Sequence, residues 1–197
     1  MKAFRTLLIF AAMTLMLRPA WAQSSSALER LKSDLLGNLS ATQVLTKWCG
    51  DLRLASPAVI RAERDAAAAK APTPEVMALL AARTDETIRY RHVRLMCGTH
   101  LLSEADNWYR PSQLTPEMNK ELEDTDIPFG TAVRPLGFHR KTLGANTNAD
   151  QGSPLQVRAL LLTQAEVPFS LVIENYSRDL VTRRPRALPG NGPPPLQ

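Results

Sequence analysis

The sequence lacks the patterns on which several common enzyme classes depend. It contains no Gly-x-Ser-x-Gly motif of a serine hydrolase and no glycine-rich phosphate-binding loop. Its two cysteines do not form a Cys-x-x-Cys pair, and its three histidines are scattered along the chain. These spacings predict neither a metal site nor a dithiol redox site.

Long hydrophobic runs and basic runs are also missing. The longest apolar segment occupies residues 6–17, which is short of the roughly 20 apolar residues needed to span a bilayer. No basic run has interleaved aromatic residues, so we expect no nucleic-acid partner. The hydrophobic content of 44% and the charged content of 22% are typical of a globular domain with a real core.

The amino-terminal residues have the features of a secretory signal. A short basic start precedes the apolar run, and Ala20-Trp21-Ala22 then has the form that signal peptidase accepts. We therefore expect residues 1–22 to be removed, giving a mature chain that begins at Gln23, is exported to the periplasm and has no stable membrane span. An uncleaved anchor is the alternative interpretation.

Removal of the signal would change the charge of the protein. The signal carries three basic residues and no acidic one, so 21 basic and 19 acidic residues would remain and the net charge would fall from +5 to +2. The high isoelectric point therefore does not indicate a polyanionic partner. Export also favours a disulfide between Cys49 and Cys97, with two buried free thiols as the alternative.

Sequence patterns predict helices first and strands later. We expect helices in residues 24–37, 41–49, 56–70, 74–83 and 116–123, from apolar spacing, alanine content and capping residues. Alternation predicts a hairpin of strands at 87–97 and 101–109, one or two short strands in 126–144, a loop at 145–154, and two strands in 155–177.

The predicted fold class is α+β, with a single antiparallel sheet of about five or six strands flanked by helices. We expect a helical segment at 23–39, the α+β domain at 40–182, and a disordered tail rich in proline and glycine at 183–197.

Two charged residues, Arg91 and Glu174, are candidates for a ligand site because each lies in an otherwise apolar setting. Arg91 alternates with Val93 and Leu95, and a guanidinium on a core-facing position requires an anionic partner. Glu174 follows the apolar residues 171–173. A structural ion pair between Arg91 and Glu174 is the alternative to a ligand site.

Two further places could contribute to the same site. The turn at residues 127–130 would bring the Phe129 side chain and the bare backbone of Gly130 up to a ligand. Arg158 lies on the strand that precedes the one carrying Glu174.

The order of these motifs resembles the chorismate pyruvate-lyase family and the related UTRA-type ligand-sensing domains of transcription regulators. The resemblance covers residues 40–181. It consists of Arg-x-Val-x-Leu at Arg91, then Ala105 and Pro111, a short helix, a Pro-apolar-Gly turn, an arginine-bearing strand, and Leu-x-x-Glu-x-aromatic at Glu174. The sequence departs from the family where His92 follows Arg91 and where Ile173 precedes Glu174.

The resemblance implies that a ligand is buried between the sheet and its flaps. Arg91 would grip a carboxylate, Glu174 would meet the ring-hydroxyl end of the ligand, and Phe129 and Gly130 would line the pocket. The implied reaction eliminates pyruvate from chorismate to give 4-hydroxybenzoate, without metal or cofactor. The alternatives are an exported protein that binds a small aromatic or cyclic carboxylate without turnover, and an envelope interaction protein that reuses the fold.

Overall fold

A computed structural model describes residues 20–37, 40–147 and 152–183. Most of the expected signal, part of the loop expected at 145–154 and nearly all of the expected tail lie outside these ranges. The longer helices are α1 Ala20–Gly37, α2 Ala41–Asp51 and α4 Pro116–Asp124. Short helical elements are α3 Pro74–Leu79, η1 Pro111–Gln113, α5 Phe129–Ala132, η2 Arg134–Leu136 and α6 Asp179–Thr182.

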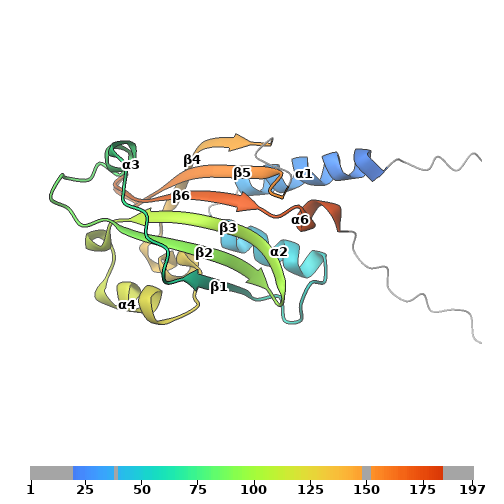
Figure 1. Ribbon diagram of the computed structural model, residues 1–197, viewed down its shortest axis with the longest axis horizontal. Coiled ribbons are helices and arrows are strands. Elements are labelled where there is room, and N and C mark those ends of the chain that lie inside the picture. Colours follow the sequence, from blue (N-terminus) through green and yellow to red (C-terminus); the bar gives the residue numbers. More distant parts are fainter. Residues whose placement is uncertain (1–19, 38–39, 148–151, 184–197) are drawn as a thin grey trace, which may run out of the picture.

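One six-stranded antiparallel sheet organises the fold, in the order β1-β2-β3-β6-β5-β4 (Figure 1). The strands are β1 Ile60–Asp65, β2 Arg89–Cys97, β3 His100–Tyr109, β4 His139–Asn146, β5 Leu155–Leu162 and β6 Pro168–Tyr176. This arrangement confirms the predicted α+β class, the β2-β3 hairpin and the β5-β6 pair.

Helices α1 and α2 pack against one face of the sheet and form the main core with it. Leu31 and Leu35 of α1 and Leu45 of α2 are buried in a cluster with Val157 of β5 and Tyr176 of β6. Helix α3 packs on the opposite face, where Val76 and Leu80 join a smaller cluster. The spacing of these apolar residues along each helix follows the helical period, which is why each helix has one buried side.

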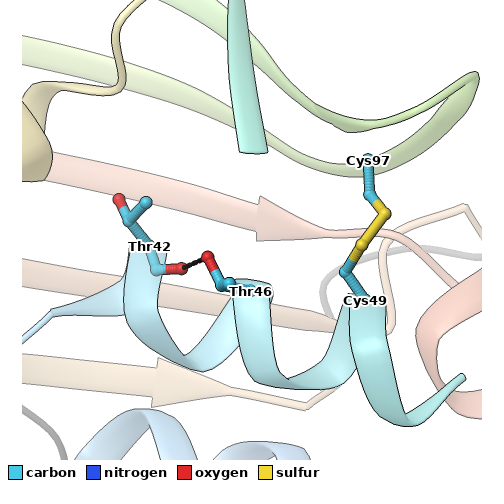
Figure 2. Close-up of a disulfide and its surroundings, with 4 residues drawn as sticks. All are labelled: Thr42, Thr46, Cys49 and Cys97. Atoms are coloured by element: carbon cyan, nitrogen blue, oxygen red, sulfur yellow. Dashed lines mark hydrogen bonds between the residues drawn. A yellow bond between two sulfur atoms is a disulfide. The ribbon is translucent and has the colours of Figure 1, made fainter. Parts of the chain in front are cut away.

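The predicted disulfide is confirmed. Cys49, in the last turn of α2, is bonded to Cys97 at the end of β2, with their Cα atoms 6.1 Å apart (Figure 2). The same close-up shows Thr46 donating a hydrogen bond to the carbonyl of Thr42 one turn earlier in α2. The covalent bond therefore fastens the carboxyl end of α2 to the end of β2 in the sheet.

The helix predicted for residues 56–70 is wrong. Residues 60–65 form the edge strand β1, in which Ile60 and Ala62 alternate inward and pair with Cys97 and Leu95 of β2. The Ala62 N–H also donates to the Asp126 carbonyl at 2.8 Å. Pairing with an existing strand outweighs the high helix propensity of the alanines in this segment, because propensity is a weak preference that tertiary contacts override.

The segment 126–144 forms more helix than predicted. Residues 129–132 and 134–136 make the short helices α5 and η2, and one strand, β4, follows. Short helical turns of this kind depend on packing rather than on sequence periodicity.

Among the described residues, no helix has both the length and the hydropathy needed to cross a membrane.

Candidate functional site

A pocket lies between the covered face of the sheet and the amino ends of α2 and α5. Its empty volume is about 540 Å³, including the mouth that opens to solvent. Strands β2 to β6 each contribute between one and three residues to the pocket lining. The lining residues are Ser40, Ala41, Thr42, Arg91, Val93, Leu95, Ala105, Asn107, Pro128, Phe129, Gly130, Phe138, Arg140, Leu161, Val172 and Glu174.

Arg91 provides a buried cation in the wall of this pocket. It lies on β2 with Val93 and Leu95 on the same face, as predicted, and is only 4% exposed. Its Nη2 donates to the Ile127 carbonyl at 3.4 Å, whereas Nε and Nη1 have no hydrogen-bond partner among the described residues. Burial lowers the pKa of Arg91 from its ordinary value.

Glu174 lines the same pocket from β6 but is already paired. Both guanidinium Nη atoms of Arg140, on β4, contact the two oxygens of Glu174, one pair at 3.4 Å. The Tyr176 hydroxyl donates to Oε2 of Glu174 at 2.9 Å. The alternative ion pair between Arg91 and Glu174 is therefore replaced by one between Arg140 and Glu174.

The pKa values of the partners of Glu174 follow from this arrangement. Burial, together with the negative charge of Glu174, raises the pKa of Tyr176 well above its ordinary value. Burial alone would lower the pKa of Arg140, but the attraction of Glu174 outweighs it and the pKa of Arg140 is raised. The three groups thus form a closed unit in which Arg140 stays charged and Tyr176 stays protonated.

Asn107 is a second polar residue in the pocket wall. It lies on β3 directly opposite Arg91 in the β2-β3 register and is 3% exposed. Its Oδ1 accepts a hydrogen bond of 2.6 Å from the hydroxyl of Ser170, which is fully buried. The Asn107 Nδ2 has no partner within the described part of the chain.

Aromatic residues close the pocket on the side away from the strands. Phe129 packs against Tyr109 and Phe169, with ring centroids 5.2 and 6.4 Å apart. Phe138 meets Phe169 edge-on at 6.1 Å. The structure therefore places the predicted Phe129 where it can cover a flat ligand, and adds Phe138 beside it.

Gly130 lies at the mouth of the pocket. A Cβ atom at this position would lie 3.4 Å from the hydroxyl oxygens of both Ser40 and Thr42, which begin α2. This mouth continues into a neighbouring surface hollow that shares Ser40, Thr42, Gly130 and Phe138. A side chain longer than a methyl group at position 130 would therefore crowd the start of α2.

The structure does not bring Arg158 to this pocket. Arg158 points to the opposite face of the sheet, where its Nη2 pairs with Glu75 at 2.7 Å and its side chain is 32% exposed. Alternation explains this placement, because Val157 and Ala159 beside it are the fully buried residues of β5 on the pocket face.

The opposite face of the sheet also carries a hydrogen-bonded carboxylate at Asp106. Its oxygens accept from the Tyr90 hydroxyl at 2.6 Å and from Lys70 at 2.9 Å, and one contacts His92 Nδ1 at 2.9 Å. Burial alone would raise the pKa of Asp106, but these hydrogen bonds lower it below its ordinary value. This cluster ties the segment before α3 to the centre of the sheet.

Sequence reasoning missed Arg140 and Asn107. Asn107 shares the inward alternation of Ala105 and Tyr109 on a strand that the sequence does predict, so a polar residue at an inward position was the available signal. Arg140 had no comparable signal, because its neighbours in β4 are half-buried or exposed and show no clean alternation.

Comparison with known proteins gives one clear relative in sequence. No family model matches the chain. The uncharacterised protein y4mC of Sinorhizobium fredii (strain NBRC 101917 / NGR234) is 38% identical over 182 residues, which is 81% of this chain and 77% of y4mC. The chain belongs to the y4mC family. This relationship covers most of both proteins.

Solved structures resemble this member of the y4mC family in fold. PhnF from Mycobacterium smegmatis matches with a TM-score of 0.52 and 14% identity, over 74% of this chain and 67% of PhnF. YydK from Bacillus subtilis matches with a TM-score of 0.43 and 17% identity, over 66% of this chain and 62% of YydK. The match to PhnF shows the predicted UTRA-type, chorismate lyase-like fold.

Proposed function

We propose that this protein binds a small aromatic or cyclic carboxylate in the pocket, with Arg91 as the anchor. The observation that carries the proposal is the buried guanidinium of Arg91, whose Nε and Nη1 have no partner among the described residues although only 4% of the residue is exposed. A buried cation without an acceptor is costly. A carboxylate offers two oxygens in the geometry that suits a guanidinium.

The charges around Arg91 support an anionic ligand. Arg140 and Glu174 neutralise each other at the other side of the pocket, so the lining keeps one net positive charge, at Arg91. Asp126, which attracts this charge, lies outside the lining. The unpartnered polar atoms of Arg91, Asn107 and Arg140 in this wall are all N–H donors. A ligand rich in acceptor oxygens complements such a wall.

The apolar part of the lining supports a ring. Val93, Ala105 and Val172 form a floor of small side chains on the sheet, and Phe129 and Phe138 lie among the opposite lining residues. Small apolar side chains and aromatic rings in one lining offer dispersion contacts to an unsaturated or aromatic ring. The UTRA-type fold is consistent with binding of a small molecule in this place.

Elimination of pyruvate from chorismate is the second candidate, because Glu174 lies in the same pocket as Arg91. Binding without turnover is favoured, since Glu174 already accepts hydrogen bonds from Arg140 and Tyr176 and offers little freedom to handle a proton. We further propose that the protein acts after export, which suits the disulfide between Cys49 and Cys97.

Calorimetric titration with 4-hydroxybenzoate tests the binding proposal. The protein should bind 4-hydroxybenzoate, and it should bind the uncharged analogue 4-hydroxybenzamide much more weakly. Arg91→Ala should weaken carboxylate binding by about 10- to 100-fold, as expected for loss of a charged hydrogen-bonded pair. Arg158→Ala is the matched control, because this arginine lies outside the pocket.

Equal affinity for the acid and the amide, or unchanged binding by Arg91→Ala, would refute the anchor. Incubation with chorismate, followed by the absorbance of 4-hydroxybenzoate, separates the two candidate functions. We expect no product at high protein concentration, and steady formation of product would favour the lyase.

A further inference from the structure

Asn107 has a feature that the proposed carboxylate site does not use. Its side chain is 97% buried, as its 3% exposure shows, and it lines the pocket. Nδ2 nevertheless has no hydrogen-bond partner among the residues that the structure describes. An amide N–H₂ group kept from water without an acceptor costs free energy, so a purely structural role would favour an apolar residue here.

The orientation of the Asn107 amide is set by its neighbour on β6. Ser170 is fully buried and donates its hydroxyl hydrogen to Asn107 Oδ1 at 2.6 Å. This bond uses the acceptor end of the amide and leaves the donor end free. Arg91 stands directly opposite Asn107 across the β2-β3 pair, and its own unpartnered atoms are donors too, so it cannot accept from Nδ2.

Arg91 and Asn107 therefore present donors to the same pocket from adjacent positions. Directly opposed residues in an antiparallel pair have Cβ atoms about 5 Å apart, so these two side chains enter the pocket next to each other. If a ligand carboxylate meets Arg91, a second oxygen on the same small molecule lies within the reach of Asn107.

We infer that Asn107 is a specificity-determining residue, and that the ligand is an oxygenated carboxylic acid rather than a bare hydrocarbon acid. This inference rests on the proposed carboxylate site. The Asn107 Nδ2 donates to a hydroxyl, ether or carbonyl oxygen of the ligand, and Ser170 acts as a positioning residue that holds the amide in that orientation. A site with a buried donor discriminates against ligands that leave this donor unpaired.

The test compares benzoate with 2-, 3- and 4-hydroxybenzoate by calorimetric titration of the full-length mature protein. At least one hydroxy isomer should bind the wild-type protein about 10-fold or more tightly than benzoate does. In Asn107→Leu, a replacement of similar size without a donor, this preference should fall below about 3-fold. These limits correspond to the roughly 10-fold effect of one neutral buried hydrogen bond.

The variant Ser170→Ala provides a second test, in which the Asn107 Nδ2 donor remains present. The amide loses its fixed orientation, so the hydroxy preference should decrease but remain larger than in Asn107→Leu. Ser103→Ala is the control, because Ser103 is a fully buried serine of β3 that does not line the pocket. It should keep the wild-type preference.

The outcomes distinguish this inference from the proposal on which it rests. If none of the four acids binds the wild-type protein, the carboxylate site and the role of Asn107 are both overturned. If benzoate and its hydroxy isomers bind wild type equally, or if Asn107→Leu and Ser170→Ala keep the preference, the role of Asn107 alone is overturned and the Arg91 anchor stands.

Discussion

At the scale of single residues, the two buried arginines of the pocket differ in whether they have a carboxylate partner. Arg140 has a carboxylate partner and Arg91 has none among the described residues. Both arginines lie two strands from Glu174, since β5 separates β4 from β6 and β3 separates β2 from β6. Strand order alone therefore does not decide between them: Arg140 reaches Glu174 over β5, whereas the Nη2 of Arg91 donates to the Ile127 carbonyl.

The buried pair of Arg140 and Glu174 yields a stability prediction. Glu174→Leu should lower the free energy of unfolding by about 3–5 kcal/mol, because it leaves a buried arginine without its partner. Arg140→Met combined with Glu174→Leu should recover much of this loss, since neither charge then remains. Urea unfolding followed by circular dichroism measures both values, and a double variant as unstable as Glu174→Leu would contradict the explanation.

Asp106 yields a prediction on pH. Hydrogen bonds from Tyr90, Lys70 and His92 outweigh burial and hold the pKa of Asp106 below its ordinary value. A carboxyl whose pKa is lower in the folded than in the unfolded state adds stability above the unfolded pKa of about 4, and this stability is lost as the pH falls through the folded value.

Asp106→Asn should therefore be less stable than wild type at pH 6, and the difference should shrink steadily below about pH 4. Urea unfolding at a series of pH values measures the two curves. Parallel curves between pH 6 and pH 2 would show that the charge of Asp106 does not contribute. Glu166→Gln is a suitable control, because this carboxylate is largely exposed and lies in a turn.

At the scale of elements, α2 connects the pocket with the covalent bond. Its first residues, Ser40 to Thr42, line the pocket, and its last turn carries Cys49. Ser40 also caps the helix by accepting from the Gln43 N–H at 3.5 Å. The position of the mouth therefore depends on how firmly α2 is held to the sheet.

The disulfide yields a prediction at this scale. The bond closes a loop with a sequence separation of 48 residues, for which the chain-entropy relation gives about 4 kcal/mol of stabilisation. The double variant Cys49→Ala, Cys97→Ala should lose about this much in urea unfolding. Dithiothreitol should destabilise wild type by a similar amount and leave the double variant unchanged. A reductant effect on the double variant would point to another cause.

At the scale of the whole molecule, the expected export signal remains a prediction. Helix α1 begins at Ala20, so the expected cleavage after Ala22 falls within its first residues. Cleavage after Ala22 would keep Ala27, Leu31 and Leu35, which are buried residues of α1, in the mature chain. Intact-mass measurement of protein recovered from the periplasm should give a chain that begins at Gln23. A mass that retains residues 1–22 would favour the uncleaved anchor.

Several features could be read from the sequence because they depend on local order. The inward position of Arg91 follows from strict alternation with Val93 and Leu95 in β2, and the starts of α3 and α4 follow from Thr-Pro-Glu capping sequences. The disulfide could be predicted because only two cysteines exist, so a single pairing is possible. Neighbouring residues alone carry the information for the strand alternation and the helix starts, whereas the disulfide follows from the number of cysteines.

Other features were decided only by the tertiary structure. Residues 60–65 became the strand β1 because the edge of β2 was available for pairing. Arg140 rather than Arg91 met Glu174 although both lie two strands away from it. Sequence periodicity determined which residues face the core. Which of those residues meet across the sheet depended on strand order, register and side-chain reach, since contacts between distant segments are set by the packing of the whole chain and not by local preference.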